Sequence, residues 1–477
     1  MSRKTRRLKK LCLLSAGAYA LFFVGGALLY PKIKINDRVQ DAEAKTIDEA
    51  QFFNIHHTDE KASIFSSRDQ ALDLRCELMD VAKKELYITQ YAIENDDSGD
   101  IFIQHLLRAT DRGVKVHLIG NGMAMKWKLG SFYKKLALVS HKNIDFRIYG
   151  GLNLLKPWTI NNVMHDKLLI VDDKYFVSSG RNVGDRFMLG SEKDKNTYDM
   201  DIVVKADGDR RPIIAAGKRY FHQIWTSPYT KKGLAFEDYI SSSLAQKSED
   251  KVFSNEQELN QKYHQKMAPK TLQSLEFSTI DEARLLHNNP HENIKRPYIW
   301  ENVSAFLNSR QKMTLQTPYL VLDNTLMKYL NTDRLQENKQ TILTNSEATS
   351  PNLLAFTGYM ARKAQDLTWF HIDEYQGNGS IHNKGFIYGD RVMALGSFNT
   401  DPRSTFLDSE NLLVLKSAGA TKQLRAVMNR YEKQSLRCQT VSQYQKKQGV
   451  KVKPLNKAKS RLMAIVSKII RPFSYLT

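Results

Sequence analysis

Two short segments of the sequence carry a histidine and a lysine at the same spacing. His165 and Lys167 are separated by one residue, and His382 and Lys384 repeat this spacing 217 residues later. An imidazole can attack phosphorus or exchange a proton near neutral pH, and an ammonium group neutralises phosphate oxygens. Two such pairs, each in an apolar stretch that ends in a small-residue turn with asparagine, are difficult to obtain by chance. The repeat therefore predicts that the two places in the chain share one chemical role.

Each pair is followed by further polar residues at a matching offset. Asp172 follows the first pair, and Asn182 ends the segment Ser-Gly-Arg-Asn. In the second copy, Ser397 and Asn399 belong to the segment Gly-Ser-Phe-Asn at the same distance from the histidine. The two copies therefore share a small-residue turn that ends in asparagine.

The second copy departs from the first at one position. The residue that corresponds to Asp172 is Gly389, and the nearest acid, Asp390, is displaced by one residue. On a regular strand such a shift turns the side chain to the opposite face. Because Asp172 is assigned no proton transfer, we expect activity to survive its absence from the second copy.

Strands and helices alternate in both halves of the chain. In the first half, hydrophobic periodicity predicts strands at 86–93 and 114–120 around a helix at 101–113, and then a strand pair at 163–182. The second half repeats this order, with the elements predicted at 300–311, 313–321, 338–346, 350–367 and 380–399. Since residues i and i+2 share a face of a strand, each histidine and lysine should point the same way. The pattern predicts two α/β lobes related by a pseudo-twofold axis.

The N-terminal segment is suited to a membrane. Residues 11–30 contain no charge and would form about 30 Å of helix, enough to cross a bilayer core. Six basic residues precede this run, so the positive-inside bias places the N-terminus in the cytosol and the rest of the chain across the membrane. A secretory signal cleaved after Ala20 is the alternative, but the apolar run continues beyond that residue, which favours an uncut anchor.

The net charge of +20 is concentrated at the two ends. Residues 1–10 contain six basic side chains and 441–477 contain nine, and neither segment has an acid; the remainder has 56 basic and 51 acidic residues. A nearly neutral body argues against a nucleic-acid partner. Apolar residues at helical spacing in the tail predict a basic amphipathic helix on an anionic membrane surface, with a helix packed on the body as the alternative. The three cysteines are too scattered for a disulfide framework or a metal site.

These motifs resemble those of the phospholipase D superfamily and, within it, the bacterial cardiolipin synthases. The similarity covers roughly 61–230 and 296–440, and it is carried by MHDKLLIVDDKYFVSSGRNVGDRF and by GSFNTDPRS followed by LDSENLLVL. In that superfamily two lobes bring their His-Lys-Asp motifs into one active site. The resemblance therefore implies an α/β fold class with two similar phospholipase D-like lobes, preceded by a transmembrane helix.

The predicted organisation of the chain follows from the motifs and the resemblance. The segments are 1–10 (basic cytoplasmic tip), 11–30 (transmembrane signal-anchor), 31–60 (linker), 61–230 (first lobe), 231–295 (connector), 296–440 (second lobe) and 441–477 (basic amphipathic tail).

The resemblance also implies roles for individual residues. His165 would be the nucleophile that forms a phosphohistidine and His382 the general acid and base, although the sequence is equally compatible with the reverse. Orienting carboxylates correspond to Asp199 and Glu410, with Asp201 as a rival of Asp199. Lys167 and Lys384 would neutralise the phosphate, and Asn182, Asn399 and Ser397 would bind its oxygens. Asp172 would have a supporting role. The resemblance implies no metal and no other cofactor.

The function implied by the resemblance is that of a phosphatidyltransferase in the bacterial inner membrane, with a periplasmic catalytic body. Its substrates would be phospholipids, namely phosphatidylglycerol and, as a further donor, phosphatidylethanolamine. A hydrolase that releases phosphatidic acid uses the same motifs, as do a nuclease and a non-catalytic lipid-binding relative. The sequence gives no indication of a protein partner or of the oligomeric state.

Overall fold

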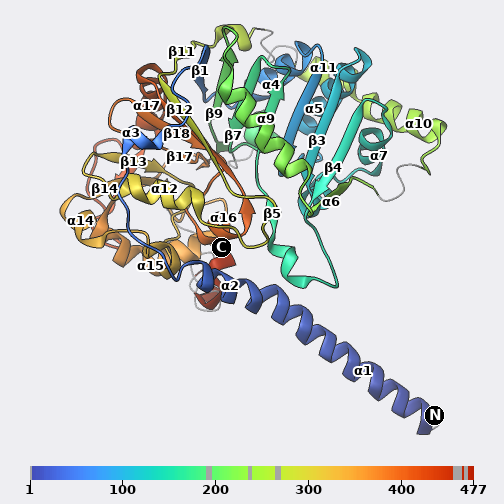
Figure 1. Ribbon diagram of the computed structural model, residues 1–477, viewed down its shortest axis with the longest axis horizontal. Coiled ribbons are helices and arrows are strands. Elements are labelled where there is room, and N and C mark those ends of the chain that lie inside the picture. Colours follow the sequence, from blue (N-terminus) through green and yellow to red (C-terminus); the bar gives the residue numbers. More distant parts are fainter. Residues whose placement is uncertain are drawn as a thin grey trace.

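The computed structural model describes residues 3–189, 196–234, 239–263, 270–454, 463, 465–466 and 471–476. Two large mixed sheets lie side by side in the body of the molecule (Figure 1). In order across the first sheet, the strands are β10 (Thr230–Lys232), β4 (Ile144–Tyr149), β3 (Lys115–Asn121), β2 (Glu85–Gln90), β6 (Leu168–Val171), β7 (Tyr175–Ser179), β9 (Asp201–Ala206), β1 (Glu60–Phe65) and β11 (Ser278–Thr279).

Over the ranges described, the second sheet repeats this arrangement in its eight strands and has no counterpart of β11. Its order is β21 (Ser435–Arg437), β15 (Phe370–Tyr375), β14 (Gln340–Asn345), β13 (Met313–Gln316), β17 (Gly385–Tyr388), β18 (Val392–Gly396), β20 (Asn411–Lys416) and β12 (Glu282–His287). Three adjacent strands are parallel in each sheet, β2–β4 and β13–β15, and the remaining neighbours are antiparallel. The predicted α/β fold with two similar lobes is confirmed.

Helices cover both sheets. In the first lobe they are α4 (Ala71–Asp80), α5 (Asp97–Asp111), α6 (Gly122–Lys128), α7 (Phe132–Ser140), α8 (Asp185–Met188) and α9 (Pro212–Trp225). In the second lobe they are α12 (Tyr298–Leu307), α13 (Asn324–Met327), α14 (Thr332–Glu337), α15 (Leu353–Trp369), α16 (Pro402–Phe406) and α17 (Ala418–Glu432). Helix α9 contacts β12 of the second lobe, and α17 contacts β1 of the first lobe. Each of these helices therefore also packs against a strand of the other lobe.

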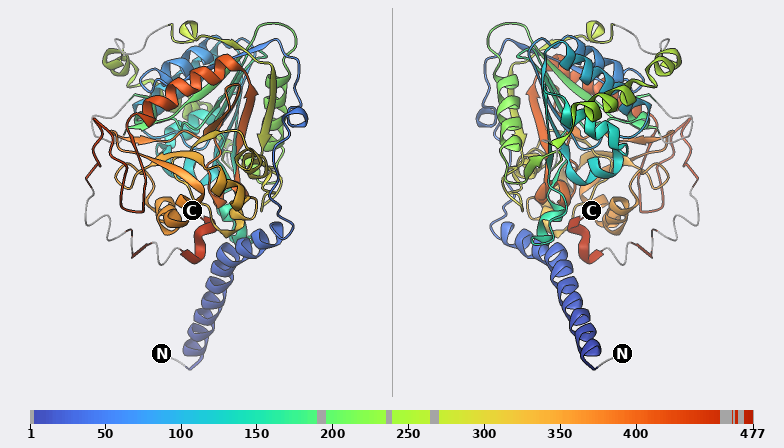
Figure 2. Two further views of the ribbon diagram at one scale, coloured as in Figure 1. Left: turned by 90° about the vertical axis from the view of Figure 1, so that its left-hand side faces the viewer. Right: turned by 90° about the vertical axis from the view of Figure 1, so that its right-hand side faces the viewer.

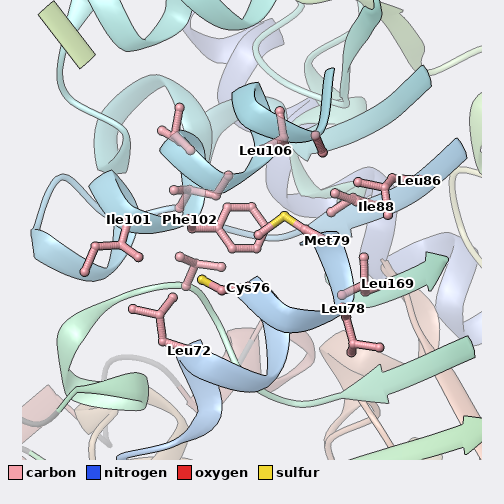
Figure 3. Close-up of a cluster of buried hydrophobic side chains, with 14 of the residues drawn as sticks. Leu72, Cys76, Leu78, Met79, Leu86, Ile88, Ile101, Phe102, Leu106 and Leu169 are labelled. Carbon is pink, nitrogen blue, oxygen red and sulfur yellow. The ribbon is translucent and has the colours of Figure 1, made fainter. Parts of the chain in front are cut away.

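The core of the first lobe shows why α4 and α5 form amphipathic helices. Phe102 of α5 lies among Cys76 and Met79 of α4, above the strand residues Ile88 and Leu169 (Figure 3). All of these side chains are buried, and full burial of each large one contributes about 1.5–3 kcal/mol. Cys76 therefore behaves as a small core residue, and its thiol is free.

A third buried cluster joins the two lobes. It combines residues of β6 and β9 in the first sheet with residues of β18 and β20 in the second, such as Ile170, Ile202, Met393 and Leu413. Because both sheets contribute apolar side chains to this shared layer, their relative position is set by packing. That position brings the two histidine motifs together.

The segment 231–295 differs from the expected connector. It contains α10 (Ser242–Phe253) and α11 (Glu256–Tyr263), which pack on α7 and α5 of the first lobe. It also contains β12, which pairs with β20 along its whole length. Since β12 occupies the place in the second sheet that β1 occupies in the first, the second lobe begins at β12 and not at residue 296.

A long helix leaves the body at the N-terminus (Figure 2). It comprises α1 (Arg3–Val24), a π-helical turn η1 (Gly25–Leu29) and α2 (Tyr30–Arg38), and α3 (Glu49–Phe52) follows it. Within the described residues this is the one helix long and apolar enough to cross a membrane, and its most apolar window is not buried. Its end is fixed to the body, because Ile35 and Val39 are buried in the core of the second lobe.

The C-terminal residues that the structure describes pack on the body. Residues Arg471–Leu476 form the 3-10 turn η5, which contacts α16, and Tyr475 is buried in the core of the second lobe. The tail was expected to form an amphipathic helix through its apolar residues Leu462, Ile465, Val466, Ile469 and Phe473, and of these Leu462 and Ile469 lie outside the described residues. The helix on a membrane surface and the helix packed on the body therefore both stay predictions.

Candidate active site

The two His-x-Lys pairs lie in breaks between strands. His165 and Lys167 connect β5 (Val163–Met164) to β6, and His382 and Lys384 connect β16 (Ser380–Ile381) to β17. The prediction that each pair lies on one strand is therefore wrong. The physical reason is that β5 and β16 leave their own sheets and pair with short strands of the opposite lobe.

In each of these short pairings, a strand of one lobe pairs with a strand of the other. Strand β5 runs parallel to β19 (Asp408–Ser409), and β16 runs parallel to β8 (Thr197–Tyr198). The His165 N–H donates to the carbonyl of Ser409 at 2.9 Å, and the His382 N–H donates to the carbonyl of Tyr198 at 2.7 Å. The residue that follows each of these carbonyls is an acid, so backbone pairing places a carboxylate beside each imidazole.

Each histidine forms a dyad with that carboxylate. Nδ1 of His165 lies 2.8 Å from Oε1 of Glu410, and Nδ1 of His382 lies 2.6 Å from Oδ2 of Asp199. An anionic carboxylate at this distance accepts the Nδ1 proton and leaves Nε2 as the basic nitrogen. The rival acid Asp201 does not contact a histidine, because the guanidinium of Arg75 binds it at 3.0 Å.

The environment keeps both imidazoles neutral. Burial, together with the ammonium groups of Lys167 and Lys384, lowers the pKa of His165 well below its usual value. Burial and then Lys384 lower the pKa of His382 to about 3. Both imidazoles are therefore unprotonated at Nε2 at neutral pH, as a nucleophile or a base requires.

The two carboxylates differ in their ionisation. Burial raises the pKa of Glu410 to about 7, although Lys167 opposes the shift. Burial also disfavours the charge on Asp199, but Lys384 and His382 outweigh that effect and its pKa is lowered. The Asp199 dyad is therefore anionic at neutral pH, whereas the Glu410 dyad is close to its titration midpoint.

Both lysines of the motifs are buried beside their histidines. The ammonium groups of Lys167 and Lys384 donate to the carbonyls of His165 and His382, respectively. Nζ of Lys384 also lies 3.2 Å from Nε2 of His382. Burial lowers the pKa of Lys167 to about 7 and that of Lys384 to about 8. A bound anion would favour the charged form of both lysines.

A cavity of about 590 Å³ opens over the histidines. Tyr91 packs edge-on against His165 and Phe187 packs edge-on against His382, with ring centroids 5.1 and 5.5 Å apart. The cavity walls include both histidines, Tyr91, Phe187, Asn182, Asn399, Tyr319, Asp401, Arg403 and Asp408. The side-chain oxygens of Asn182 and Asn399 are buried and have no partner among the described residues, so each can accept a hydrogen bond from a ligand.

Ser397 and Asp172 are predicted site residues with positions different from those expected. Ser397 is fully buried, and its hydroxyl accepts the N–H of Asn411 and hydrogen-bonds to Glu410, so it supports the dyad and does not line the cavity. Asp172 lies in the turn between β6 and β7, where its carboxylate accepts the N–H groups of residues 83–85 at 2.9–3.0 Å. Its role is to hold the start of β2.

Gly389 occupies the equivalent turn of the second lobe. Asp172 has φ 51° and Gly389 has φ 59°, both in the left-handed region. A Cβ at Gly389 would lie 1.6 Å from Nε2 of Gln311, so the Gln311 side chain fills the space used by the aspartate in the first lobe. Asp390 is exposed and pairs with Arg425.

The sequence reasoning missed several charged residues of the cavity. The Arg403 guanidinium lies 3.4 Å from Oδ2 of Asp408, and Asp401 caps α16 by accepting the Ser404 N–H at 2.7 Å. Burial raises the pKa of Asp401 to about 8 and that of Asp408 to about 7. The available signal was the run GSFNTDPRS, which contains Asp401 and Arg403. In the described part of the chain, no three His, Cys, Asp or Glu side chains are grouped to hold a metal.

Two α/β lobes that each deliver a His-x-Lys pair and an orienting acid to one cavity define an enzyme of the phospholipase D superfamily. The chain belongs to the family described as "Cardiolipin synthase, PLD-like domain", whose model matches residues 76–225 and 303–431. It is thus a phospholipid enzyme of the cardiolipin synthase family.

Individual relatives are distant. The chain is 23% identical over 382 residues to cardiolipin synthase C of Escherichia coli, which covers 73% of this chain and 79% of that protein. It is 23% identical over 414 residues to an uncharacterised protein of Helicobacter pylori, covering 76% and 78%. The crystal structure of phosphatidylserine synthase from Haemophilus influenzae superimposes with a TM-score of 0.60 at 13% identity and covers 93% of this chain and 99% of that one. That structure shares the two-lobed fold.

Proposed function

We propose that this protein is a membrane-anchored phosphatidyltransferase that joins two phospholipids into cardiolipin. The observation that carries the proposal is the pair of crossed dyads, His165–Glu410 and His382–Asp199, which open on one cavity. Two imidazoles on one phosphodiester provide the nucleophile and the proton carrier that a double displacement needs. The similarity to cardiolipin synthase C supports the choice of substrate class.

In the proposed first step, Nε2 of His165 attacks the phosphorus of a donor such as phosphatidylglycerol. A nitrogen–phosphorus bond forms and the bond from phosphorus to the headgroup oxygen breaks. His382, protonated at Nε2 beside the bound phosphate, gives its proton to the departing alkoxide. The product is free glycerol and a phosphatidyl group on His165.

In the second step, the neutral His382 removes a proton from the hydroxyl of a second phosphatidylglycerol. The resulting oxygen attacks phosphorus, the bond to His165 breaks, and cardiolipin is released. His382 is protonated again, so protons balance over the cycle. Lys167, Lys384 and the two asparagine amides stabilise the charge on the phosphate oxygens.

We further propose that the helix Thr5–Arg38 is an uncut anchor with its N-terminus in the cytosol. Six basic residues on the N-terminal side of the apolar run support this orientation. Residues 39–477 would then lie on the periplasmic side of a bacterial inner membrane, next to the lipids on which they act.

The test uses the purified full-length chain in vesicles of phosphatidylglycerol, with and without phosphatidylethanolamine, and lipid products followed by mass spectrometry. We expect cardiolipin from the wild type and none from His165→Ala or His382→Ala. His371→Ala, which changes an exposed histidine of β15, is the matched control and should leave the product unchanged. Phosphatidic acid without cardiolipin under every donor condition would overturn the proposal in favour of a hydrolase.

A second measurement assigns the nucleophile. In His382→Ala the intermediate forms more slowly, because the acid for the leaving group is lost. The phosphatidyl group that does reach the enzyme should persist, because the hydroxyl of the acceptor is no longer deprotonated. Mass spectrometry at neutral or alkaline pH should then find the phosphatidyl group on His165. An adduct on His382 in the His165→Ala protein would reverse the two roles.

A further inference from the structure

We propose that the loop of residues 150–158, between β4 and the 3-10 turn η2 (Pro157–Asn161), inserts into the bilayer beside the N-terminal helix. The loop would insert into the outer leaflet of a phospholipid membrane. This proposal rests on the proposed anchoring of the helix, and it goes further by adding a second point of insertion next to the cavity.

The loop exposes large apolar side chains. Leu152, Leu154 and Leu155 are 52%, 56% and 81% exposed within a run of six residues that has one charge, Lys156. The loop is the segment that extends below the two sheets, toward α1 and away from α4 and α11 (Figure 1). Three neighbouring leucines in water are unfavourable, and such patches mark a surface that is covered in the working state.

The loop is attached to the membrane-spanning helix. The Tyr19 hydroxyl donates to the carbonyl of Leu154 at 2.8 Å, and the Trp158 ring lies 6.5 Å from that of Phe22 and 5.4 Å from that of Tyr30. Tyr19 is near the middle of the uncharged run 11–30. If the helix spans the bilayer, these contacts place the leucines at the depth of the outer leaflet.

Several backbone groups of the loop form hydrogen bonds within the loop and its junction with η2, as a segment surrounded by lipid requires. Oδ1 of Asn153 accepts the N–H groups of Leu155 and Lys156 at 3.0 Å, and the Thr159 N–H donates to the carbonyl of Lys156 at 3.0 Å. Unpaired backbone groups are costly in lipid, so these internal hydrogen bonds lower the cost of insertion. The long side chain of Lys156 can extend its ammonium to the headgroups.

The loop and turn η5, which contacts the N-terminal helix, both lead to residues that line the cavity. The loop leads through η2 into β5, where Val163 lines the cavity two residues before His165. In η5, Leu476 lines the cavity, and the hydroxyl of its neighbour Tyr475 donates to the carbonyl of Leu28 in η1. Insertion would therefore hold the cavity rim at the headgroup level, where a phospholipid reaches the histidines with its acyl chains still in the bilayer.

The experiment places an environment-sensitive fluorophore on a single cysteine of the full-length protein in phosphatidylethanolamine–phosphatidylglycerol vesicles that contain a spin-labelled lipid quencher. Cys12→Ser/Leu155→Cys reports on the loop, and Cys12→Ser/Val81→Cys is the matched control. Val81 is 44% exposed and ends α4 on the far side of the body. The other native cysteines, Cys76 and Cys438, are buried.

We expect quenching by the lipid spin label at position 155 and quenching by aqueous iodide at position 81. The wild-type Cys12 in α1 is labelled in a separate sample and reports on the anchor alone. Lipid quenching at Cys12 together with iodide quenching at position 155 would overturn the loop proposal and leave the anchor intact. Iodide quenching at both positions would overturn both.

A kinetic readout complements the spectroscopy. Leu152→Asn/Leu154→Asn/Leu155→Asn should raise the KM for lipid in vesicles by roughly tenfold, because the inserted apolar area is lost. With short-chain lipid dissolved in detergent the kcat should stay at the wild-type value, since no loop side chain contacts the histidines. An unchanged KM in vesicles would contradict the proposal.

Discussion

Nδ1 of His165 lies 2.8 Å from Oε1 of Glu410, although 245 residues separate them and they belong to different lobes. The same relationship holds in the opposite direction between His382 and Asp199 at 2.6 Å. Each imidazole is thus oriented by a carboxylate from the other lobe. Neither lobe contains a complete dyad, so the site exists only when the two sheets are packed together.

Glu410→Gln should reduce kcat by roughly 10²–10⁴-fold, because the amide no longer stabilises one tautomer of the His165 ring. Glu282→Gln is the matched control, since Glu282 also lies 2.8 Å from a histidine Nδ1, that of His56, on the surface. It should retain wild-type activity. Steady-state kinetics and thermal melting of both variants check this, and a Glu410→Gln enzyme with kcat within threefold of the wild type would contradict the role.

The activity should fall at acid pH with an apparent pKa near 7. Burial raises the pKa of Glu410 to about 7, so the carboxylate that orients His165 is lost as the pH falls through that value. Asp199, with its lowered pKa, stays ionised over the same range. A profile of kcat against pH should show this limb in the wild type. Its persistence in Glu410→Gln would assign it to another group.

Asp401→Asn should stabilise the protein at alkaline pH. Burial raises the folded-state pKa of Asp401 to about 8, so the folded protein holds a proton that the unfolded chain releases from about pH 4 upward. Stability from this group therefore falls as the pH rises to 8. Asparagine caps a helix as well as aspartate does. Between pH 5 and pH 8.5 the stability of the variant should rise by roughly 4 kcal/mol relative to that of the wild type.

Thermal or denaturant unfolding in detergent at the two pH values measures this difference. Asp48→Asn provides the control, because Asp48 caps α3 in the same way at an exposed position. A pH-independent difference between Asp401→Asn and the wild type would show that Asp401 is ionised in the fold.

Asp172→Ala should destabilise the protein without impairing catalysis. The substitution leaves three backbone N–H groups without their acceptor, which costs about 1–3 kcal/mol. The neighbouring Asp173→Ala removes only a surface ion pair with Lys218 and should cost less than about 1 kcal/mol. Unfolding curves and kcat values distinguish the two. A loss of kcat greater than tenfold in a folded Asp172→Ala protein would contradict this prediction and indicate a role for Asp172 in catalysis.

Arg403→Gln should raise KM for an anionic phospholipid more than it lowers kcat. The guanidinium lines the cavity, and the charge-assisted contact that it offers to a phosphate is worth about 1.5–3 kcal/mol, or roughly tenfold or more in KM. Arg391→Gln breaks an Arg–Asp pair on the surface and serves as the control. A selective loss of kcat with KM unchanged would indicate contact with the reacting atoms instead.

Much of the fold could be predicted because it depends on local patterns. Alternating apolar strands and amphipathic helices occur twice in the chain, and the repeat of His-x-Lys marked equivalent places in the two halves. The uncharged run 11–30 indicated the N-terminal helix, which in the structure extends from Arg3 to Arg38. The sequence predicts a connector at 231–295, because β12 has only six residues and its apolar pattern does not stand out from the polar residues around it.

The sequence predicted most residues of the candidate site but not which of them contact one another. The sequence by itself determined that two histidines, two lysines and two asparagines recur at matched offsets, because residue type and spacing are local properties. Only the tertiary structure decided that Glu410 hydrogen-bonds to His165 and that Asp199 hydrogen-bonds to His382. It also decided that Ser397 and Asp172 bind backbone N–H groups outside the cavity. Those relationships depend on how β5 and β16 cross to the opposite lobe, and that crossing is set by the packing of one sheet against the other.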